Sequence, residues 1–530
     1  MARRRYGKTR GIVAAGHAKT AAAGCHALRE GGNAFDAAVA AAFMSFVAEP
    51  SLTTICGAGF MMTHEGRTRR ARLFDFFAEM PGRNRRRIRT SDLDFKAVHL
   101  DFGGTLQEFF IGRGAAATPG NVHGLLTVHK RLGRLPLRVL LEPAMVAARE
   151  GVPITEKQAT VLNVVKGTVM ATAGTRALYA PQGHLLRRGE LFCNPALADT
   201  LDQLAREGRP LFYRGAIAAQ IAREIGDRGG LITRRDLAAY RTIVRTPLLT
   251  HFRGKTLLTN PPPSHGGQLI AFSLQLLESV SWPKTLSPRD PCFYRTLVEI
   301  MWLTNHARTH VRRFPPTVVR RYQKWLQARL HGVTPLPSEA VPDAHRAPGN
   351  TTHLSVLDDE RNAAAVTTSH GEGNGICIPG TGIVLNNLLG EEDINPNGFH
   401  QWPPGTRLPS MMAPTLILHR GRPVLVLGSA GSNRLRTAIF QTIARLFDLH
   451  LPIARAVNDP RIHWERGQLD LEPGLPVPVR RILTRLEPHV VQWKAQNIFF
   501  GGLHAVMCHP DGTFGGAGDR RRGGTVRSVD

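Results

Sequence analysis

The chain has 530 residues, of which 42% are apolar and 7% aromatic, and this composition excludes wholesale disorder. The length is compatible with one large layered body or with two to three domains. Lys and Arg number 68 against 41 Asp and Glu, a net charge of +27 that attracts polyanions. The basic runs are not interleaved with aromatic residues and match no nucleic-acid-binding motif, so we expect a solvated arginine-rich surface and no nucleic-acid partner. A basic polyanion-binding protein stays the competing class; the runs are Arg3 to Arg5, Arg67 to Arg72, Arg83 to Arg89 and Arg520 to Arg522.

Cellular location and cofactors are constrained by what the sequence lacks. No apolar run is long enough to cross a bilayer, and the basic start has no hydrophobic region behind it. We expect no membrane span and a cytoplasmic location, with a periplasmic or secreted one open if the start is misassigned. Six cysteines without a CxxC pair predict reduced thiols. His306 and His310 have a metal-like spacing on a predicted helix but no third ligand, so we expect no metal and no cofactor.

The chain before residue 350 is predicted to be mainly helical. A short strand at 11–15 is followed by Ala-rich helices to Leu28 and from Ala34 to Val47, whose small side chains indicate close packing on a sheet. The later elements in this part are strands at 73–77 and 257–259, and helical segments at 120–131, 142–150, 195–245, 268–277 and 295–331.

The Pro-rich segment 332–350 is the best linker candidate. After it the pattern changes to strands at 351–358, 363–369, 414–419 and 423–428, followed by a helix from 434 to 447. A change from helices to strands near residue 350 is consistent with a cut in the chain there.

Thr351 stands at the first position of a predicted strand. A chain cut before it would carry a hydroxyl nucleophile and a free α-amine on one residue, and that amine titrates near pH ~8, close to working pH. A turn centred on Glu360 places Ser369 opposite Thr351 in an antiparallel pair, where its hydroxyl can orient the nucleophile. Taken alone, an ordinary Thr-rich strand start remains the alternative.

Two further loops suit a reaction at Thr351. The stretch 428–433 joins an apolar strand to an amphipathic helix, and the unpaired N–H groups there suit an oxyanion, because no P-loop Lys follows. A plain capped turn is the alternative. The loop 385–393 ends in Glu391, Glu392 and Asp393, which suit a substrate ammonium group or form a solvated turn.

With these segments in place, the chain resembles the γ-glutamyltransferase family of N-terminal-nucleophile hydrolases over nearly its whole length. The strings that carry the resemblance occur in the family's order, at 11–17, 31–40, 261–267, 351–353, 385–387, 410–415 and 428–432.

The resemblance implies an α+β fold, a four-layer αββα sandwich. It also implies a precursor that cuts itself between Asn350 and Thr351, leaving large (1–350) and small (351–530) pieces of one intertwined unit. The implied reaction is transfer or hydrolysis of γ-glutamyl amides such as glutathione through an acyl-enzyme on Thr351, with an amine or water as acceptor.

Residue roles follow from the same resemblance. It assigns catalysis to Thr351, Ser369, Gly431 and Ser432, and substrate binding to Glu391 and Ser410, with Glu392 added as the next carboxylate of the acidic loop.

The resemblance is incomplete around the substrate. Phe77 stands where the family has the Arg that clamps the α-carboxylate, and one of Arg83, Arg85, Arg86 or Arg87 is a candidate replacement. Pro409, Leu388, His370 and Gly371 replace other polar recognition residues. Two alternatives therefore stay open: an amide acylase with a shifted substrate, and a catalytically weak polyanion-binding relative.

Overall fold

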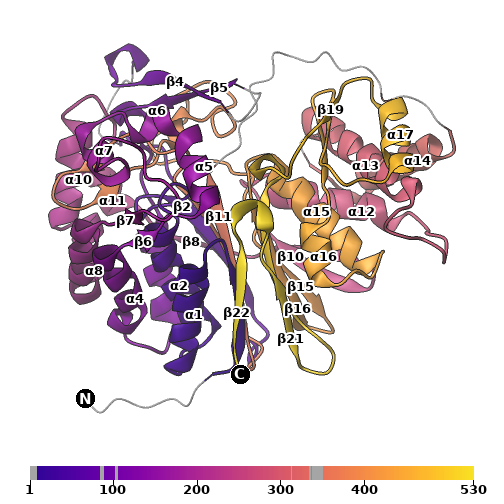
Figure 1. Cartoon of the computed structure of the whole chain (residues 1–530), viewed down its shortest axis with the longest axis horizontal. Coiled ribbons are helices and arrows are strands. Elements are labelled where there is room, and N and C mark those ends of the chain that lie inside the picture. The colour runs from indigo at the N-terminus through magenta and orange to yellow at the C-terminus, as the bar shows by residue number, and fades with distance from the viewer. Residues whose placement is uncertain (1–8, 84–88, 102–105, 312, 333–335, 337–349) are drawn as a thin grey trace.

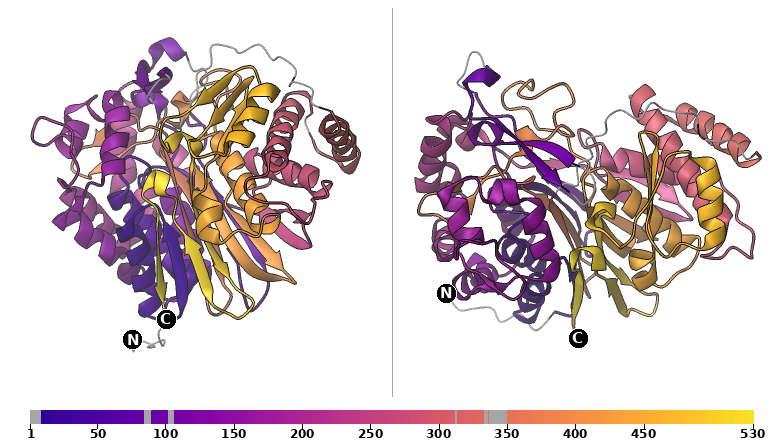
Figure 2. Two further views of the ribbon diagram at one scale, coloured as in Figure 1. Left: turned by 45° about the vertical axis from the view of Figure 1, so that its right-hand side comes forward. Right: turned by 45° about the horizontal axis from the view of Figure 1, so that its top comes forward.

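Two β-sheets packed face to face, with helices on both outer sides, form the body of the protein (Figure 1, Figure 2). The computed structural model describes residues 9–83, 89–101, 106–311, 313–332, 336 and 350–530. Its layers confirm the predicted αββα sandwich.

Strands from both sides of residue 350 are mixed in each sheet. The first sheet has the order β22 (Thr525–Val529), β1 (Gly11–Ala15), β11 (Thr351–Asp358), β12 (Ala363–Ser369), β2 (Ala58–His64), β3 (Ala71–Phe76) and β8 (Ile243–Arg245). The second has the order β21 (Phe514–Ala517), β20 (Gly502–Cys508), β16 (Arg422–Ala430), β15 (Thr415–His419), β10 (Lys255–Thr259) and β9 (Leu248–Phe252). Neither sheet is complete without residues from each side of Asn350.

The helices form one outer layer against each sheet (Figure 1). Every residue of α2 is buried, because its Ala-rich sequence lets it pack closely on the first sheet. The layer on that side contains α1 (Ala18–Arg29), α2 (Ala34–Ala48), α3 (Asn121–Leu132), α4 (Leu137–Glu150), α8 (Pro195–Glu207), α9 (Arg209–Tyr213), α10 (Ala216–Gly226) and α11 (Arg234–Ala239). The layer on the other side contains α12 (Gly266–Glu278), α13 (Pro291–His310), α14 (Pro316–Leu330), α15 (Arg434–Phe447), α16 (Ile453–Asn458) and α17 (Val477–Leu486).

Smaller elements surround this frame. They are α5 (Glu156–Val164), α6 (Lys166–Val169), α7 (Ala173–Tyr179), the paired strands β4 (Lys96–Asp101) with β5 (Leu106–Ile111), β6 (Val152–Pro153) with β7 (Leu191–Phe192), β13 (Cys377–Ile378) with β14 (Ile383–Val384), and the sheet of β17 (Ile462–Glu465), β18 (Gln468–Leu471) and β19 (Val490–Gln492).

Three sequence predictions differ from the structure. The helix predicted from residue 142 begins at Leu137 and carries Pro143 inside it. The single helical segment predicted at 295–331 is two helices, because Pro315 and Pro316 follow the extended residue Val311 and start a new helix. The segment 195–245 holds four helices but ends in strand β8. The predicted linker 332–350 lies largely outside the described residues.

The hairpin of β11 and β12 has the predicted register, with Thr351 opposite Ser369. Side chains alternate along β11, so Leu354 and Val356 pack toward the helices while Leu357 packs between the sheets. Thr351 shares the face of Leu357, which places it at the end of β11 between the two sheets.

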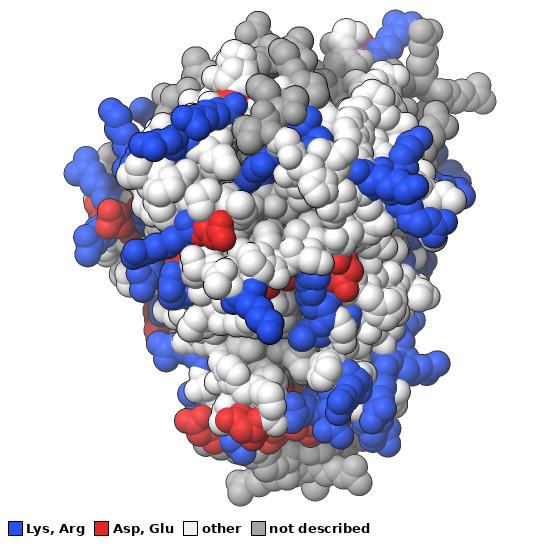
Figure 3. All heavy atoms as spheres, turned by 90° about the vertical axis from the view of Figure 1, so that its right-hand side faces the viewer, with Lys and Arg blue, Asp and Glu red and all other residues white. Residues whose placement is uncertain are grey.

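Some of the arginines that give the chain its positive charge lie on the surface, and others are buried. On the face in Figure 3, Lys and Arg spread over the surface and Asp and Glu form small groups. Arg67, Arg69 and Arg70 are exposed, as expected. Arg521 and Arg522 are buried, so the expectation of a solvated run at 520–522 is wrong for them; buried carboxylates surround them. The run at 3–5, and residues 84–88 of the run from Arg83 to Arg89, lie outside the described residues.

Among the described helices, none is long and apolar enough to span a bilayer.

Candidate active site

A small pocket opens where the ends of β11 and β12 meet the loops that follow β14 and β16. Its cavity is about 40 Å³ in the continuous chain. Five of the seven predicted site residues line it: Thr351, Ser369, Glu391, Ser410 and Ser432. The rest of the lining is mainly apolar, with Phe77, Leu388, Ile394, Met411, Met412 and Leu435, together with Asp393.

The bond between Asn350 and Thr351 is held on both sides by buried polar groups. The Ser369 hydroxyl donates to the carbonyl oxygen of Asn350 and accepts the N–H of Gly371 at 2.9 Å. The N–H of Asn350 donates to Oε1 of Glu372 at 3.0 Å. Thr351 and Ser369 are each 4% exposed, so this bond lies in a largely water-excluded environment. The peptide preceding the predicted nucleophile is therefore fixed in position.

Glu372 is a buried carboxyl group beside this bond. Burial is the largest cause that raises its pKa, to about 8, with smaller opposing effects from the Asn350 N–H and from Arg522 and Arg434. Its Oε2 atom has no hydrogen-bond partner among the described residues. Glu372 could not be identified from the sequence, because a single Glu in a Gly-rich loop carries no recognisable signal.

Arg522 contacts the other side of the nucleophile. Its Nη1 donates to the carbonyl oxygen of Thr351 at 3.2 Å. Burial lowers the pKa of Arg522 to about 10, against the opposing effect of the carboxylates of Glu372, Asp519 and Glu49. A cation therefore lies next to the residue whose α-amine cleavage would release.

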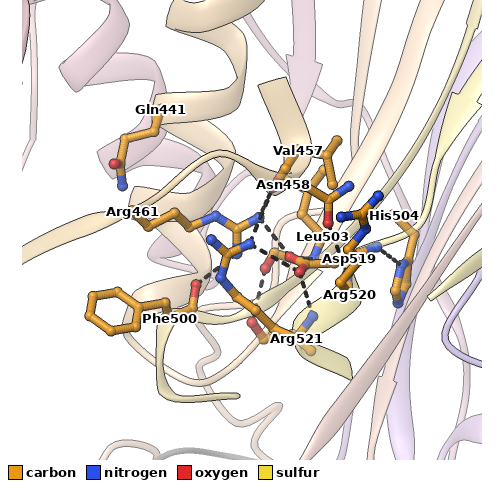
Figure 4. A network of polar contacts seen from close by, with 12 residues as sticks. Gln441, Val457, Asn458, Arg461, Phe500, Leu503, His504, Asp519, Arg520 and Arg521 are labelled. Atoms are coloured by element: carbon orange, nitrogen blue, oxygen red, sulfur yellow. Dashed lines mark hydrogen bonds and ion pairs between the residues drawn. The ribbon is translucent and has the colours of Figure 1, made fainter. Parts of the chain in front are cut away.

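A buried ion network fixes the turn that carries Arg522 (Figure 4). Asp519 accepts from Nη2 of Arg461 at 2.6 Å, from Nη1 of Arg521 at 3.1 Å, and from the N–H of Leu503 at 2.9 Å. Arg461 also donates to the carbonyl of Phe500 at 2.8 Å. These arginines hold the pKa of Asp519 well below its usual range, despite burial. The network joins β20 to the turn at 520–522.

The loop after β16 presents two backbone donors. Gly431 has φ +107° and Ser432 has φ +46°, both in the left-handed region. A Cβ on Gly431 would lie 2.8 Å from Cα of Gly501, so the position requires glycine. Among the described residues, the N–H groups of Gly431 and Ser432 have no hydrogen-bond acceptor. Such donors suit an oxyanion.

Asp393 holds this loop in place. Its Oδ2 accepts the hydroxyl of Ser432, and its Oδ1 accepts from Nδ2 of Asn433 at 3.3 Å. Sequence analysis missed this contact, although Asp393 belongs to the acidic loop that it singled out. Glu392, predicted to bind substrate, is exposed and does not line the pocket. Alternation within the loop turns Glu391 and Asp393 inward and Glu392 outward.

Glu391 is the carboxyl group that faces the pocket. It is 8% exposed, and its Oε1 has no hydrogen-bond partner among the described residues. Burial is the main cause that raises its pKa well above the usual range, and the neighbouring Glu372 and Asp393 add to it. Burial therefore favours the neutral form of Glu391, whereas a bound ammonium group would favour the carboxylate.

Phe77 occupies the expected arginine position. It is fully buried and stacks on Phe60 at 5.3 Å between ring centroids. Behind it, Arg407 donates to its carbonyl oxygen, to the hydroxyl of Tyr240 at 2.7 Å, and to Glu79 at 3.1 Å. Arg407 is thus committed to buried partners and does not line the pocket.

Of the four candidate replacements for that arginine, the structure describes only Arg83. Arg83 forms an ion pair with Glu79 at 3.1 Å and is not part of the pocket wall. Arg85, Arg86 and Arg87 lie outside the described residues. No Lys or Arg side chain is among the described residues that line this pocket.

Comparisons with known proteins give a family model, relatives in sequence and solved structures of the same fold. The family model for gamma-glutamyltranspeptidase matches residues 20–529. The glutathione hydrolase proenzyme of Escherichia coli (strain K12) is 30% identical over 550 residues, which cover 96% of this chain and 90% of that protein. The Acylase ACY 1 proenzyme of Pseudomonas sp. (strain SE83) is 29% identical over 546 residues, covering 98% and 94%. The crystal structure of cephalosporin acylase from Bacillus halodurans has the same fold, with a TM-score of 0.81 and 23% identity over 99% of this chain and 97% of that one.

Proposed function

This chain belongs to the gamma-glutamyltranspeptidase family, and we propose that it is a self-cleaving amide hydrolase and acyltransferase with Thr351 as its nucleophile. The observation that carries the proposal is the convergence of Thr351, Ser369, Glu391 and Ser432 on one pocket beside the Asn350–Thr351 bond. The proenzyme names of the two relatives support a precursor that is processed.

Self-cleavage would begin at the fixed peptide. The Thr351 hydroxyl oxygen adds to the carbonyl carbon of Asn350, and negative charge develops on the carbonyl oxygen that Ser369 contacts. The C–N bond then breaks, the hydroxyl proton passes to the nitrogen, and water hydrolyses the resulting ester. The products are residues 1–350 and 351–530, which remain one body because both pieces contribute strands to each sheet.

The mature enzyme would use the new α-amine as its base. This amine takes the hydroxyl proton as Thr351 attacks the substrate amide, and the N–H groups of Gly431 and Ser432 stabilise the oxyanion. The nearby Arg522 guanidinium disfavours the ammonium form and so keeps the amine free to accept that proton. The amine of the substrate leaves, and water or a second amine resolves the acyl-enzyme.

The pocket wall favours an acyl group without an α-carboxylate. A γ-glutamyl group carries such a carboxylate, and no described residue that lines the pocket is a cation. Burying the carboxylate against these residues alone would weaken binding by several kcal/mol. Phe77, Leu388 and Met411 instead offer apolar surface to an acyl chain. The kinship with a protein named as an acylase supports the same choice. We therefore propose an amide acylase with a mainly apolar acyl group as the first candidate.

Hydrolysis or transfer of γ-glutamyl amides such as glutathione is the second candidate. It is favoured by Glu391, a buried carboxyl group that faces the pocket and suits the α-ammonium of a glutamyl group, because its Oε1 has no hydrogen-bond partner among the described residues.

A comparison of kcat/KM for two chromogenic amides distinguishes the two candidate functions. Processed protein would be given hexanoyl-p-nitroanilide and γ-glutamyl-p-nitroanilide, with and without glycylglycine as acceptor, and Thr351→Ala would be the inactive control. We expect kcat/KM to be higher for the hexanoyl amide by about tenfold or more, or about 1.4 kcal/mol. A higher kcat/KM for the γ-glutamyl amide would establish the second candidate instead. Activity of the Thr351→Ala protein on either amide would refute the nucleophile.

A further inference from the structure

We propose that a second pocket, on the helical side of the molecule, binds a small organic anion bearing a phosphate or carboxylate group. The pocket lies between α3, α9 and α11, on the side of Figure 1 where α11 is labelled. Its lining consists of His123, Arg209, Pro210, Tyr213, Arg214, Ala238 and Arg241. It shares no lining residue with the Thr351 pocket.

The cavity is larger than the one at Thr351. Its volume is about 300 Å³, at the lower end of the range for small-molecule sites. His123 and Tyr213 form a buried floor, with their rings edge to face at 5.3 Å. Pro210 and Ala238 add apolar surface to the wall. A ring or short alkyl group fits such a floor better than a fully hydrated ion does.

Three arginines, Arg209, Arg214 and Arg241, line the pocket. Among the described residues, no Asp or Glu pairs with any of them, whereas Arg138, Arg149 and Arg206 of the same layer each have an acidic partner. Arg209 donates to the Thr127 hydroxyl at 3.3 Å. Arg241 donates to two backbone carbonyls, each at 2.7 Å. Guanidinium groups gathered around a concave surface focus a positive potential and bind oxyanions in a bidentate manner.

His123 adds no further positive charge to the pocket. Its Nδ1 lies 2.8 Å from the Thr242 hydroxyl. Burial is the main cause that lowers its pKa to about 4, and the nearby Arg209, Arg241 and Arg407 lower it further. The arginines therefore supply the charge, and the neutral imidazole supplies a polar, aromatic floor.

The pocket wall is connected to the wall of the Thr351 site. The carbonyl of Arg241 accepts from Nη2 of Arg407 at 2.6 Å, and the Tyr240 hydroxyl donates to the carbonyl of Phe77 at 2.7 Å. A ligand that binds the guanidinium of Arg241 would therefore contact the segment of Tyr240 and Arg241, which also supports Phe77.

Calorimetric titration of the purified full-length protein tests the proposal. The probes are phenyl phosphate and benzoate, which separate the two anion types, with inorganic phosphate as the bare ion and benzyl alcohol as the neutral ring. We expect saturable binding of at least one aromatic anion, weaker binding of inorganic phosphate, and none of benzyl alcohol. An absence of saturable binding of both aromatic anions up to about 10 mM, roughly the weakest useful affinity, would overturn the proposal.

Matched variants locate the site. Arg209→Gln with Arg214→Gln should weaken binding of the aromatic anion by about tenfold or more, or about 1.4 kcal/mol, because the anion loses two of the three guanidinium groups that line the pocket. Arg320→Gln on the exposed surface of α14 removes one charge elsewhere and should leave affinity unchanged. If the double variant does not fold, Arg214→Gln alone replaces it in the titration, because this side chain is exposed. Equal affinity in wild type and the pocket variants would contradict the assignment.

Discussion

Replacing Ser369 with alanine should slow the proposed self-cleavage without preventing folding. The Ser369 hydroxyl donates to the carbonyl oxygen of Asn350, on which negative charge would develop. Removal of one such donor from a buried oxyanion site costs about 3–4 kcal/mol, or roughly 100- to 1,000-fold in rate. Ser369→Thr keeps a hydroxyl and should retain most of the rate.

The assay follows the loss of the uncut chain on denaturing gels after synthesis in a cell-free system. Thr368→Val is the matched control, because it deletes a buried hydroxyl on the same strand that contacts Thr53 and not the scissile peptide. Cleavage of Ser369→Ala at the wild-type rate would refute the proposed role. If Ser369→Ala and Thr368→Val slow self-cleavage equally, the cause is general destabilisation and not the loss of the hydroxyl at Asn350.

Three further predictions concern stability. Burial raises the pKa of Glu372 to about 8, so the folded chain holds that proton more tightly than the unfolded chain, and stability falls as pH rises from about 4.5 toward 8. In the uncut Thr351→Ala background, Glu372→Gln should flatten this decline in thermal melts; an unchanged pH profile would contradict it. Asp519→Asn should destabilise the protein by about 3–5 kcal/mol in chemical denaturation, because two buried arginines lose their counter-charge; a change below 1 kcal/mol, about the value for a surface pair, would disprove this. Gly431→Ala should cost about 1–3 kcal/mol through its positive φ, read from the same denaturation curves, and a neutral effect would refute the strain.

The hairpin could be predicted from the sequence because its register depends on a short-range pattern, whereas the αββα sandwich was expected from the resemblance to a known family. The turn at 358–362 and the flanking strands define the register that places Ser369 opposite Thr351. The apolar face of the segment after residue 433 likewise predicted α15 with the bounds that the structure has, Arg434–Phe447.

The parts of the site that were missed depend on contacts between distant segments. Arg522 lies 171 positions from the Thr351 carbonyl that it contacts, and in sequence it belongs to an arginine run that indicates a solvated surface. Arg407 contacts Glu79 across 328 positions. Burial of such groups is decided by which carboxylates the fold brings near, and periodicity along one segment carries no information about that.

The acidic loop shows an intermediate case. Its composition indicated carboxylates near a substrate, but the path of its backbone decides which of them point inward. Glu391 and Asp393 line the pocket and Glu392 is exposed.

Intact-mass spectrometry with N-terminal sequencing of freshly purified protein is the decisive test of self-cleavage before Thr351. We expect two associated pieces, the smaller beginning at Thr351, and a single 58.1-kDa chain for Thr351→Ala. Wild-type protein that hydrolyses amides while only the unbroken chain is present would contradict it.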